Sequence, residues 1–302
     1  MEKNTLHTSQ SMKFLSKACL IICSLLAEIS YSQTENKSFN QGKSWYDQGE
    51  YSKAVEAFEQ AVKQSPNNAD YYYWLGAANI GALDKASFFQ KATFAFDAKS
   101  NLLKAIDLDP KHVSARVTLA NYYIQAPAIA GGSYSKALEQ AEELKKIDLF
   151  KGVEIEALVY LNDEEYEKAE QLYLNMIRDG TNNKKVYYRL SVISISRKDF
   201  KQAINYCKKS IEVYPDYLMG YYQFGKVASL GNIELKSGIT HLNKYIQSDY
   251  QSGLPKKHWA YFRLGEIYRS LKQPLEAKKS YEQALEIKGD FNEAKQALKK
   301  LD

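Results

Sequence analysis

The chain has few of the residues that build disulfides and metal sites. Its 302 residues include three cysteines and four histidines. Two of the cysteines, Cys19 and Cys23, lie in an apolar segment near the N-terminus, which leaves Cys207 in the rest of the chain. A single cysteine forms no intramolecular disulfide, and no histidine pair has metal-ligand spacing. We expect a protein without metal or cofactor, held by its hydrophobic core, in which the Cys207 thiol is buried and inert.

Catalytic motifs are also missing. The sequence contains no nucleophile elbow and no Ser/Lys signature. The stretch Gly42-Lys43-Ser44 lacks the upstream glycine of a phosphate-binding loop, because Lys37 stands five residues before Gly42. We therefore expect no catalytic residue and no enzyme activity. An enzyme whose site forms only together with a partner is the alternative.

An excess of charge of one sign is absent as well. The 41 basic and 36 acidic residues leave a net charge of +5, and no run of five basic residues occurs. Without a basic block or a motif that reads RNA or DNA, nucleic acid is not an expected partner. The composition, with 45% hydrophobic and 25% charged residues, is that of a globular protein. Tyrosine is abundant, at 24 residues, and suits half-buried positions with one edge in water.

The N-terminus has the pattern of an export signal. Lys13 and Lys17 precede an apolar stretch over 18–27, and small residues follow at the −3 and −1 positions of a cut between Ser32 and Gln33. The apolar stretch is too short to span the roughly 30 Å hydrocarbon core of a bilayer. The pattern therefore predicts a signal peptide that is cleaved near this point.

This interpretation divides the chain into a signal peptide over 1–32 and a mature domain over 33–302. The mature protein is then exported to the periplasm or cell exterior of a bacterium, with no transmembrane span. An uncleaved anchor and a stray apolar tail are the alternatives. If the signal interpretation fails, the protein is a cytosolic one.

A spacing of alanine, a large side chain, a second small side chain and proline recurs along the chain. It first occurs at Ala54, Phe58, Ala61 and Pro66. Because steps of three and four residues stay on one helix face, each copy predicts a helix that ends at proline or glycine. The small residues allow a second helix to approach closely. The main further copies are Ala98, Leu102, Ala105 and Pro110; Ala203, Cys207, Ser210 and Pro215; and Ala277, Tyr281, Ala284 and Gly289.

A second pattern precedes these helices, with a bulky residue, a leucine, a small residue and an aromatic. In the last copy these are Tyr261, Leu264, Gly265 and Tyr268. Together the two patterns resemble the tetratricopeptide repeat, a helix–turn–helix unit of about 34 residues. The resemblance covers residues 35–291. It implies an all-α fold, in which helix–turn–helix units stack into a right-handed superhelical solenoid.

The resemblance further implies about seven repeats and a C-terminal capping helix over 290–301. Such a helix covers the apolar face of the last repeat, which would otherwise meet water. The predicted repeats cover about 35–68, 69–112, 113–149, 150–183, 184–217, 218–252 and 258–291.

Two segments are longer than the repeat allows. Residues 80–101 contain four phenylalanines, which predicts extra helical turns or a small flap. These rings either pack internally or form an apolar ridge for a partner. Residues 125–133 lengthen a turn and include Gly131-Gly132. We interpret this segment as a plain turn between helices, with anion binding by its backbone N–H groups as the alternative.

In the tetratricopeptide family, ligands usually lie along the concave groove that the first helices form. The family's repeat phase places groove positions one residue after the bulky marker of each first helix, and four residues further on. Tyrosine at such positions supplies contact area at low entropic cost. Alternatively, neighbouring first helices pack against each other through these side chains. The predicted partner-binding residues are Phe39, Tyr73, Asn121, Tyr188, Tyr222, Lys226, Phe262 and Arg269.

The expected function is a non-catalytic protein–protein interaction scaffold that binds peptide segments or helices of partner proteins. The lysine and asparagine set with which some family members clamp a chaperone's terminal carboxylate does not occur here, so co-chaperone activity is not implied. A solenoid that binds carbohydrate or a small molecule is the alternative, since aromatic faces also stack on sugars. The sequence identifies neither the partner nor the oligomeric state.

Overall fold

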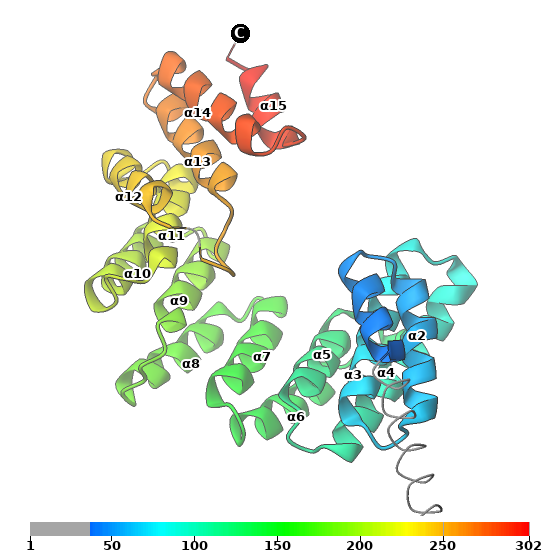
Figure 1. Cartoon of the computed structure of the whole chain (residues 1–302). Helices are drawn as coiled ribbons and strands as arrows, with labels where there is room; N and C mark the ends of the chain where they lie inside the picture. The colour runs from blue at the N-terminus through cyan, green and yellow to red at the C-terminus, as the bar shows by residue number, and fades with distance from the viewer. Residues whose placement is uncertain (1–36, 250, 302) are drawn as a thin grey trace, which may run out of the picture. The chain divides into compact units, whose positions relative to one another are not determined.

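The computed structural model describes residues 37–249 and 251–301, and every regular element within them is a helix (Figure 1). The all-α fold expected from the repeat pattern is therefore confirmed for this part of the chain. The predicted signal peptide, residues 1–32, lies outside the described residues. None of the described helices combines the length and the hydrophobicity needed to cross a membrane.

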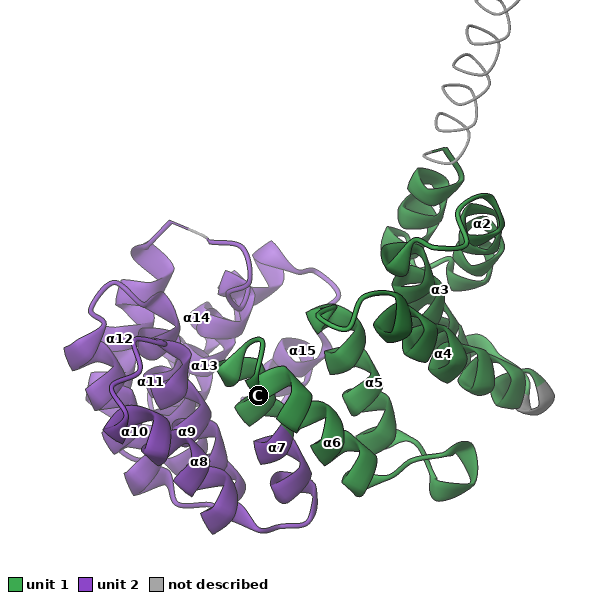
Figure 2. Cartoon of the chain, turned by 90° about the horizontal axis from the view of Figure 1, so that it is seen from below, with its two compact units in different colours: residues 1–155 green, residues 156–302 purple. Residues whose placement is uncertain are grey.

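The chain forms two compact units, residues 1–155 (unit 1) and 156–302 (unit 2), which Figure 2 colours separately. A helix over residues 37–47 begins the described part of unit 1. Successive helices then pack on one another, from α2 to α6. Their bounds are α2 (Tyr51–Gln64), α3 (Ala69–Ala82), α4 (Phe88–Leu108), α5 (Val113–Gln125) and α6 (Tyr134–Lys145), with short 3₁₀ turns η1 (Leu83–Lys85) and η2 (Ala128–Ala130).

Helix α7 (Leu149–Asn162) carries the boundary between the units, and unit 2 continues the succession of helices. From α8 to α15 each helix packs on the next, and α11 also contacts α9 and α13. A stack of helix pairs produces this combination of contacts. The bounds are α8 (Tyr166–Arg178), α9 (Lys185–Ser196), α10 (Phe200–Val213), α11 (Leu218–Gly231), α12 (Leu235–Gln247), α13 (Lys257–Ser270), α14 (Pro274–Ile287) and α15 (Asn292–Leu298).

Several first helices end in a residue with a left-handed backbone, which turns the chain into the second helix. Gly49 has a φ of 75°, and Lys198 and Lys272 have φ values of 61° and 59°. The amide that follows bonds back to the helix, as where the Asp199 N–H donates to the carbonyl oxygen of Ser194 at 2.8 Å. Such a bond satisfies a free carbonyl at the helix C-terminus. The recurrence of this turn gives successive helix pairs the same local geometry.

Glycine in the first helix of a pair lies against a large side chain of the second helix. A Cβ added at Gly265 would lie 2.3 Å from the Tyr281 ring, and one at Gly225 would lie 2.2 Å from Leu242. The small residue of the first-helix pattern is therefore required for the two helices to approach closely. The same relation joins Gly42 to Phe58 and Gly76 to Leu102.

The α9–α10 pair has serine at the position that glycine occupies in these other pairs. Ser191 is buried and hydrogen-bonds to the Cys207 thiol, which is also buried. Burial raises the pKa of the Cys207 thiol to about 12, against the opposing effect of the Ser191 hydrogen bond. A thiol with so high a pKa forms almost no thiolate at neutral pH. The expectation of a buried Cys207 is confirmed, and the raised pKa supports the expected lack of reactivity.

The lengthened segment over 80–101 forms extra helical turns, one of the two structures expected for it. After η1, helix α4 runs for 21 residues from Phe88 to Leu108. Its first turns leave Phe96 65% exposed, while Phe94 is partly buried.

The lengthened turn over 125–133 is bonded to the helix before it. The Tyr122 hydroxyl donates to the carbonyl oxygen of Ala130 at 2.5 Å, and the Ser133 N–H donates to that of Tyr123 at 2.8 Å. Gly132 comes so close to residue 126 that an added Cβ would lie 1.8 Å from the carbonyl oxygen there. These contacts support the interpretation as a turn and give Gly132 a packing role.

Helix α15 packs on α14 and covers apolar side chains of the last helix pair. Phe291, which directly precedes α15, is 1% exposed and shares a buried cluster with Tyr281 of α14. Ala294 and Ala297 of α15 belong to the same cluster. Small residues on α15 allow it to lie close to its neighbour.

Candidate functional site

The first helices of unit 2 lie side by side. Helix α11 contacts α9 on one side and α13 on the other. Side chains at matching positions of the three helices therefore share one surface. Tyr188 of α9 and Tyr222 of α11 occupy such matching positions.

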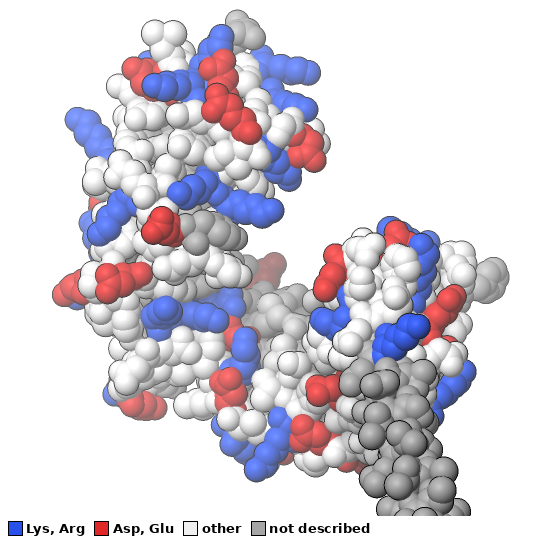
Figure 3. Space-filling view, viewed as in Figure 1, with Lys and Arg blue, Asp and Glu red and all other residues white. Residues whose placement is uncertain are grey.

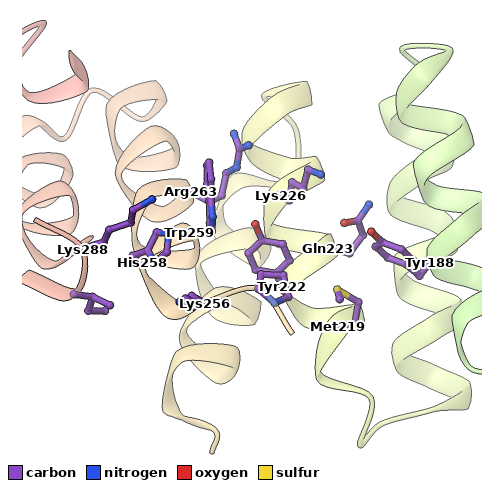
Figure 4. Close-up of a pocket in the computed structure, with 12 residues that line it drawn as sticks. Tyr188, Met219, Tyr222, Gln223, Lys226, Lys256, His258, Trp259, Arg263 and Lys288 are labelled. Atoms are coloured by element: carbon purple, nitrogen blue, oxygen red, sulfur yellow. The ribbon is translucent and has the colours of Figure 1, made fainter. Parts of the chain in front are cut away.

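A pocket with a volume of about 730 Å³ opens on this surface. Figure 4 shows Tyr188 reaching it from α9, Tyr222 and Lys226 from α11, and Trp259 and Arg263 from α13. The turn before α13 and the end of α14 complete its lining. Pockets that bind ligands usually have volumes of roughly 300–1,000 Å³.

The apolar part of the pocket consists of aromatic rings that pack against further rings behind them. The Tyr222 ring lies 5.3 Å from the Tyr245 ring, and the Trp259 ring meets the Phe291 ring edge-on at 4.7 Å. Burial raises the pKa of the Tyr222 hydroxyl, while Arg263, to which it is hydrogen-bonded, works against that rise. These contacts hold the rings in place before any ligand binds, which lowers the entropic cost of binding.

The pocket is also cationic. Lys226, Lys256, Arg263 and Lys288 line it, and none of its described lining residues is Asp or Glu. Burial lowers the pKa of the Lys226 ammonium, and the charge of Arg263 lowers it further. Figure 3 shows basic and acidic side chains interspersed over the face in view. The pocket is thus a local concentration of positive charge.

His258 adds unused hydrogen-bonding groups to the lining. The residue is 4% exposed, and neither of its ring nitrogens has a hydrogen-bond partner among the described residues. Burial lowers the pKa of the imidazole, and the charges of Lys288 and Lys256 lower it further against the opposing effect of Glu293 and Asp290, which favours the neutral ring. A neutral imidazole offers one donor and one acceptor. The Nε atom of Arg263 is buried and also lacks a partner.

Three of the predicted site residues come together in this pocket, namely Tyr188, Tyr222 and Lys226. Two others of unit 2 lie elsewhere. The Phe262 ring packs in the C-terminal cluster, 5.5 Å from the Phe291 ring. Arg269 is exposed and pairs with Glu266 at 2.9 Å.

The predicted residues of unit 1 are partly buried among its helices. The Phe39 ring stacks on the Tyr71 ring at 4.7 Å, so packing accounts for much of its surface. The Tyr73 ring lies 5.1 Å from the His112 ring, and Asn121 is partly buried on α5. Whether these three residues contact a partner stays a prediction.

The prediction from the repeat pattern missed the residues that directly follow the predicted groove residues. Gln223 and Arg263 occupy this position in α11 and α13, and both line the pocket. The Gln223 amide donates to the Ser191 hydroxyl of α9 at 3.1 Å, which ties the two first helices together. The sequence could have indicated this position, because a long polar residue occupies it in three successive first helices. The residue in α9 is Arg189.

Comparisons with known proteins identify repeats in parts of this chain. Residues 42–80 match a family model described as TPR repeat, and residues 184–217 and 260–290 match the tetratricopeptide repeat model. Tetratricopeptide repeat protein 37 of Xenopus laevis is 30% identical over 132 residues. The match spans 42% of this chain but only 8% of the frog protein. The chain therefore carries tetratricopeptide repeats.

Solved structures extend the likeness to nearly the whole fold. A tetratricopeptide repeat protein from Parabacteroides merdae has a TM-score of 0.55 at 14% identity, with 89% of this chain and 99% of that chain covered. The human IFIT1 dimer with m7Gppp-AAAA also reaches 0.55, at 15% identity, covering 84% of this chain and 59% of that chain. At such identities the likeness concerns the fold alone. This protein has the helical-solenoid fold of tetratricopeptide repeat proteins.

Proposed function

We propose that the protein is a non-catalytic scaffold that binds segments of partner proteins, as extended peptides or helices, on the first helices of unit 2. The pocket between α9, α11 and α13 is the observation that carries the proposal. The pocket combines aromatic rings that pack against other rings with polar groups that have no hydrogen-bond partner among the described residues. Ring contacts supply apolar area, and a few placed polar groups fix orientation, as in other recognition sites.

We also propose that the scaffold works outside the cytoplasm, in the envelope or at the surface of a bacterium. The basic, apolar and small-residue order before Gln33 supports this location. Its partners are then other exported or envelope proteins.

Peptide selection on the full chain tests the binding function. A library of random dodecamer peptides is displayed and selected on the immobilised protein, and affinities of the enriched peptides are measured by titration. Tyr188→Ala removes a ring from the pocket, so we expect it to weaken binding roughly tenfold or more.

Tyr187→Ala is the matched control for this measurement. Tyr187 is the neighbouring tyrosine of α9, and its ring lies 6.4 Å from the Tyr214 ring rather than in the pocket lining. We expect this variant to retain binding. Equal losses in both variants, or a selection that enriches no sequence, would contradict the proposed function.

A further inference from the structure

The pocket holds cations near one another without a lining carboxylate to offset them. The repulsion between Arg263 and Lys226 contributes to the lowered pKa of the lysine. Both side chains are partly buried, so water and salt screen them less than they screen exposed charges. A bound anion would relieve this repulsion and would meet little competition from the protein itself.

Glu266 of α13 interacts electrostatically with Arg263, but its carboxylate is bonded to other side chains. Glu266 pairs with Arg269 at 2.9 Å and accepts a hydrogen bond from the Tyr281 hydroxyl at 2.5 Å. Despite its burial the pKa of its carboxyl is lowered, because Arg269 and Tyr281 hydrogen-bond to the ionised form. Glu266 does not belong to the pocket lining, and its ion pair is with Arg269 rather than with a cation of the pocket.

His258 narrows the chemistry of the anion. Its neutral ring needs both an acceptor for its N–H and a donor for its other nitrogen. An inorganic anion without a proton to donate satisfies only the first requirement. A peptide residue with a carboxylate side chain satisfies both, because its backbone N–H can donate and its carboxylate can accept. The buried nitrogens of His258 therefore favour a ligand that both donates and accepts, such as an acidic peptide, over an inorganic anion without a proton.

We propose that the pocket binds an acidic side chain of the partner segment, with its carboxylate held by Arg263 and Lys226 and its peptide groups bonded to His258. The apolar part of the same segment lies against Tyr222 and Trp259. This assignment rests on the proposed function and adds the chemistry of the partner to it. Charge complementarity and the unsatisfied nitrogens of His258 and Arg263 are the observations behind it.

Two synthetic peptide pools test the assignment. Both are labelled with an uncharged fluorophore, have blocked termini and carry random neutral residues, and they differ only in a central Glu or a central Gln. Fluorescence anisotropy with the full chain measures their affinities. We expect the Glu pool to bind roughly tenfold more tightly than the Gln pool, and added sodium chloride to weaken the Glu pool alone.

Variants of the full chain identify the groups responsible. Arg263→Gln and Lys226→Met are each expected to remove most of the preference for the Glu pool, whereas Arg263→Lys retains part of it because the charge remains. Lys278→Gln is the matched control, since Lys278 is an exposed cation of α14 that lies outside the pocket lining. Circular dichroism and thermal melting confirm that each variant is folded. Loss of preference in Lys278→Gln as well would overturn the assignment.

The remaining outcomes separate this assignment from the proposed function. If both pools bind equally and depend on Tyr188, the groove binds peptides but the acidic preference is wrong. If neither pool binds, both proposals fail. Inorganic phosphate is the third probe. If phosphate raises the melting temperature in a manner that depends on Arg263 while the two pools bind equally weakly, the site is one for a small anion and the acidic-peptide assignment is overturned.

Discussion

Phe291→Ala is expected to lower the free energy of unfolding of the last helix pair by about 3–5 kcal/mol, the usual cost of removing a buried phenylalanine. The side chain is 1% exposed, and its ring lies within 4.8 Å of the His258 ring and 5.5 Å of the Phe262 ring. It therefore joins α13 to the start of α15. The cavity left by the alanine has rigid walls on several sides, which limits relaxation.

Hydrogen exchange of the full chain measures this effect where it arises. In an array of repeats, each unit contacts only its neighbours, so the loss of protection should concentrate in α13 to α15. Helices of unit 1 should keep their protection. Leu275→Ala is the control, because Leu275 is 79% exposed and should change stability by less than about 0.5 kcal/mol. Uniform loss over all helices would contradict the repeat organisation.

Gly265→Ala is expected to destabilise the protein by about 1–3 kcal/mol, although alanine favours helices over glycine by about 1 kcal/mol. The added Cβ would lie 2.3 Å from the Tyr281 ring, which is fully buried and bonded to Glu266. The ring cannot swing aside without breaking that bond, so the two helices must move apart. Packing thus predicts a decrease in the free energy of unfolding, whereas helix propensity predicts an increase. Urea unfolding of the variant decides between them.

Gly289→Ala supplies the matched comparison. This glycine lies after α14, and the nearest atom that an added Cβ would meet is a carbonyl oxygen at 3.9 Å. We expect a change of less than about 0.5 kcal/mol. If Gly265→Ala had an equally small effect, or stabilised the protein, the result would contradict the close approach of α13 and α14.

The helix pairs could be predicted because their signals are local. Small and large residues spaced by three and four positions define one helix face wherever the helix lies, and the glycine contacts of Gly225 and Gly265 follow from that spacing. The same phase identified Tyr188 and Tyr222 as members of one surface. These residues share it because α9 and α11 repeat one another's geometry.

The rest of the site depends on contacts that a repeat phase does not contain. Phe262 occupies the same position in its helix as Tyr222 does in α11. Its helix, α13, belongs to the final helix pair, however, and the Phe262 ring packs against Phe291 instead of against another repeat. Its ring therefore joins the C-terminal cluster. Lys256 and Lys288 lie outside the first-helix pattern, next to the ends of α13 and α14, and reach the pocket only through the packing of those helices.

The most direct test of the account is the nitrogen NMR spectrum of the full chain labelled with ¹⁵N-histidine, recorded with and without the tightest peptide of the Glu pool. His258→Gln assigns the His258 signals. Two further histidines serve as internal references, His241 against the Phe224 ring at 4.3 Å and His112 bonded to Asp70 at 3.1 Å. We predict that saturating peptide shifts both ring nitrogens of His258 and leaves the references unchanged. Shifts at His241 or His112 with His258 unmoved would contradict the account.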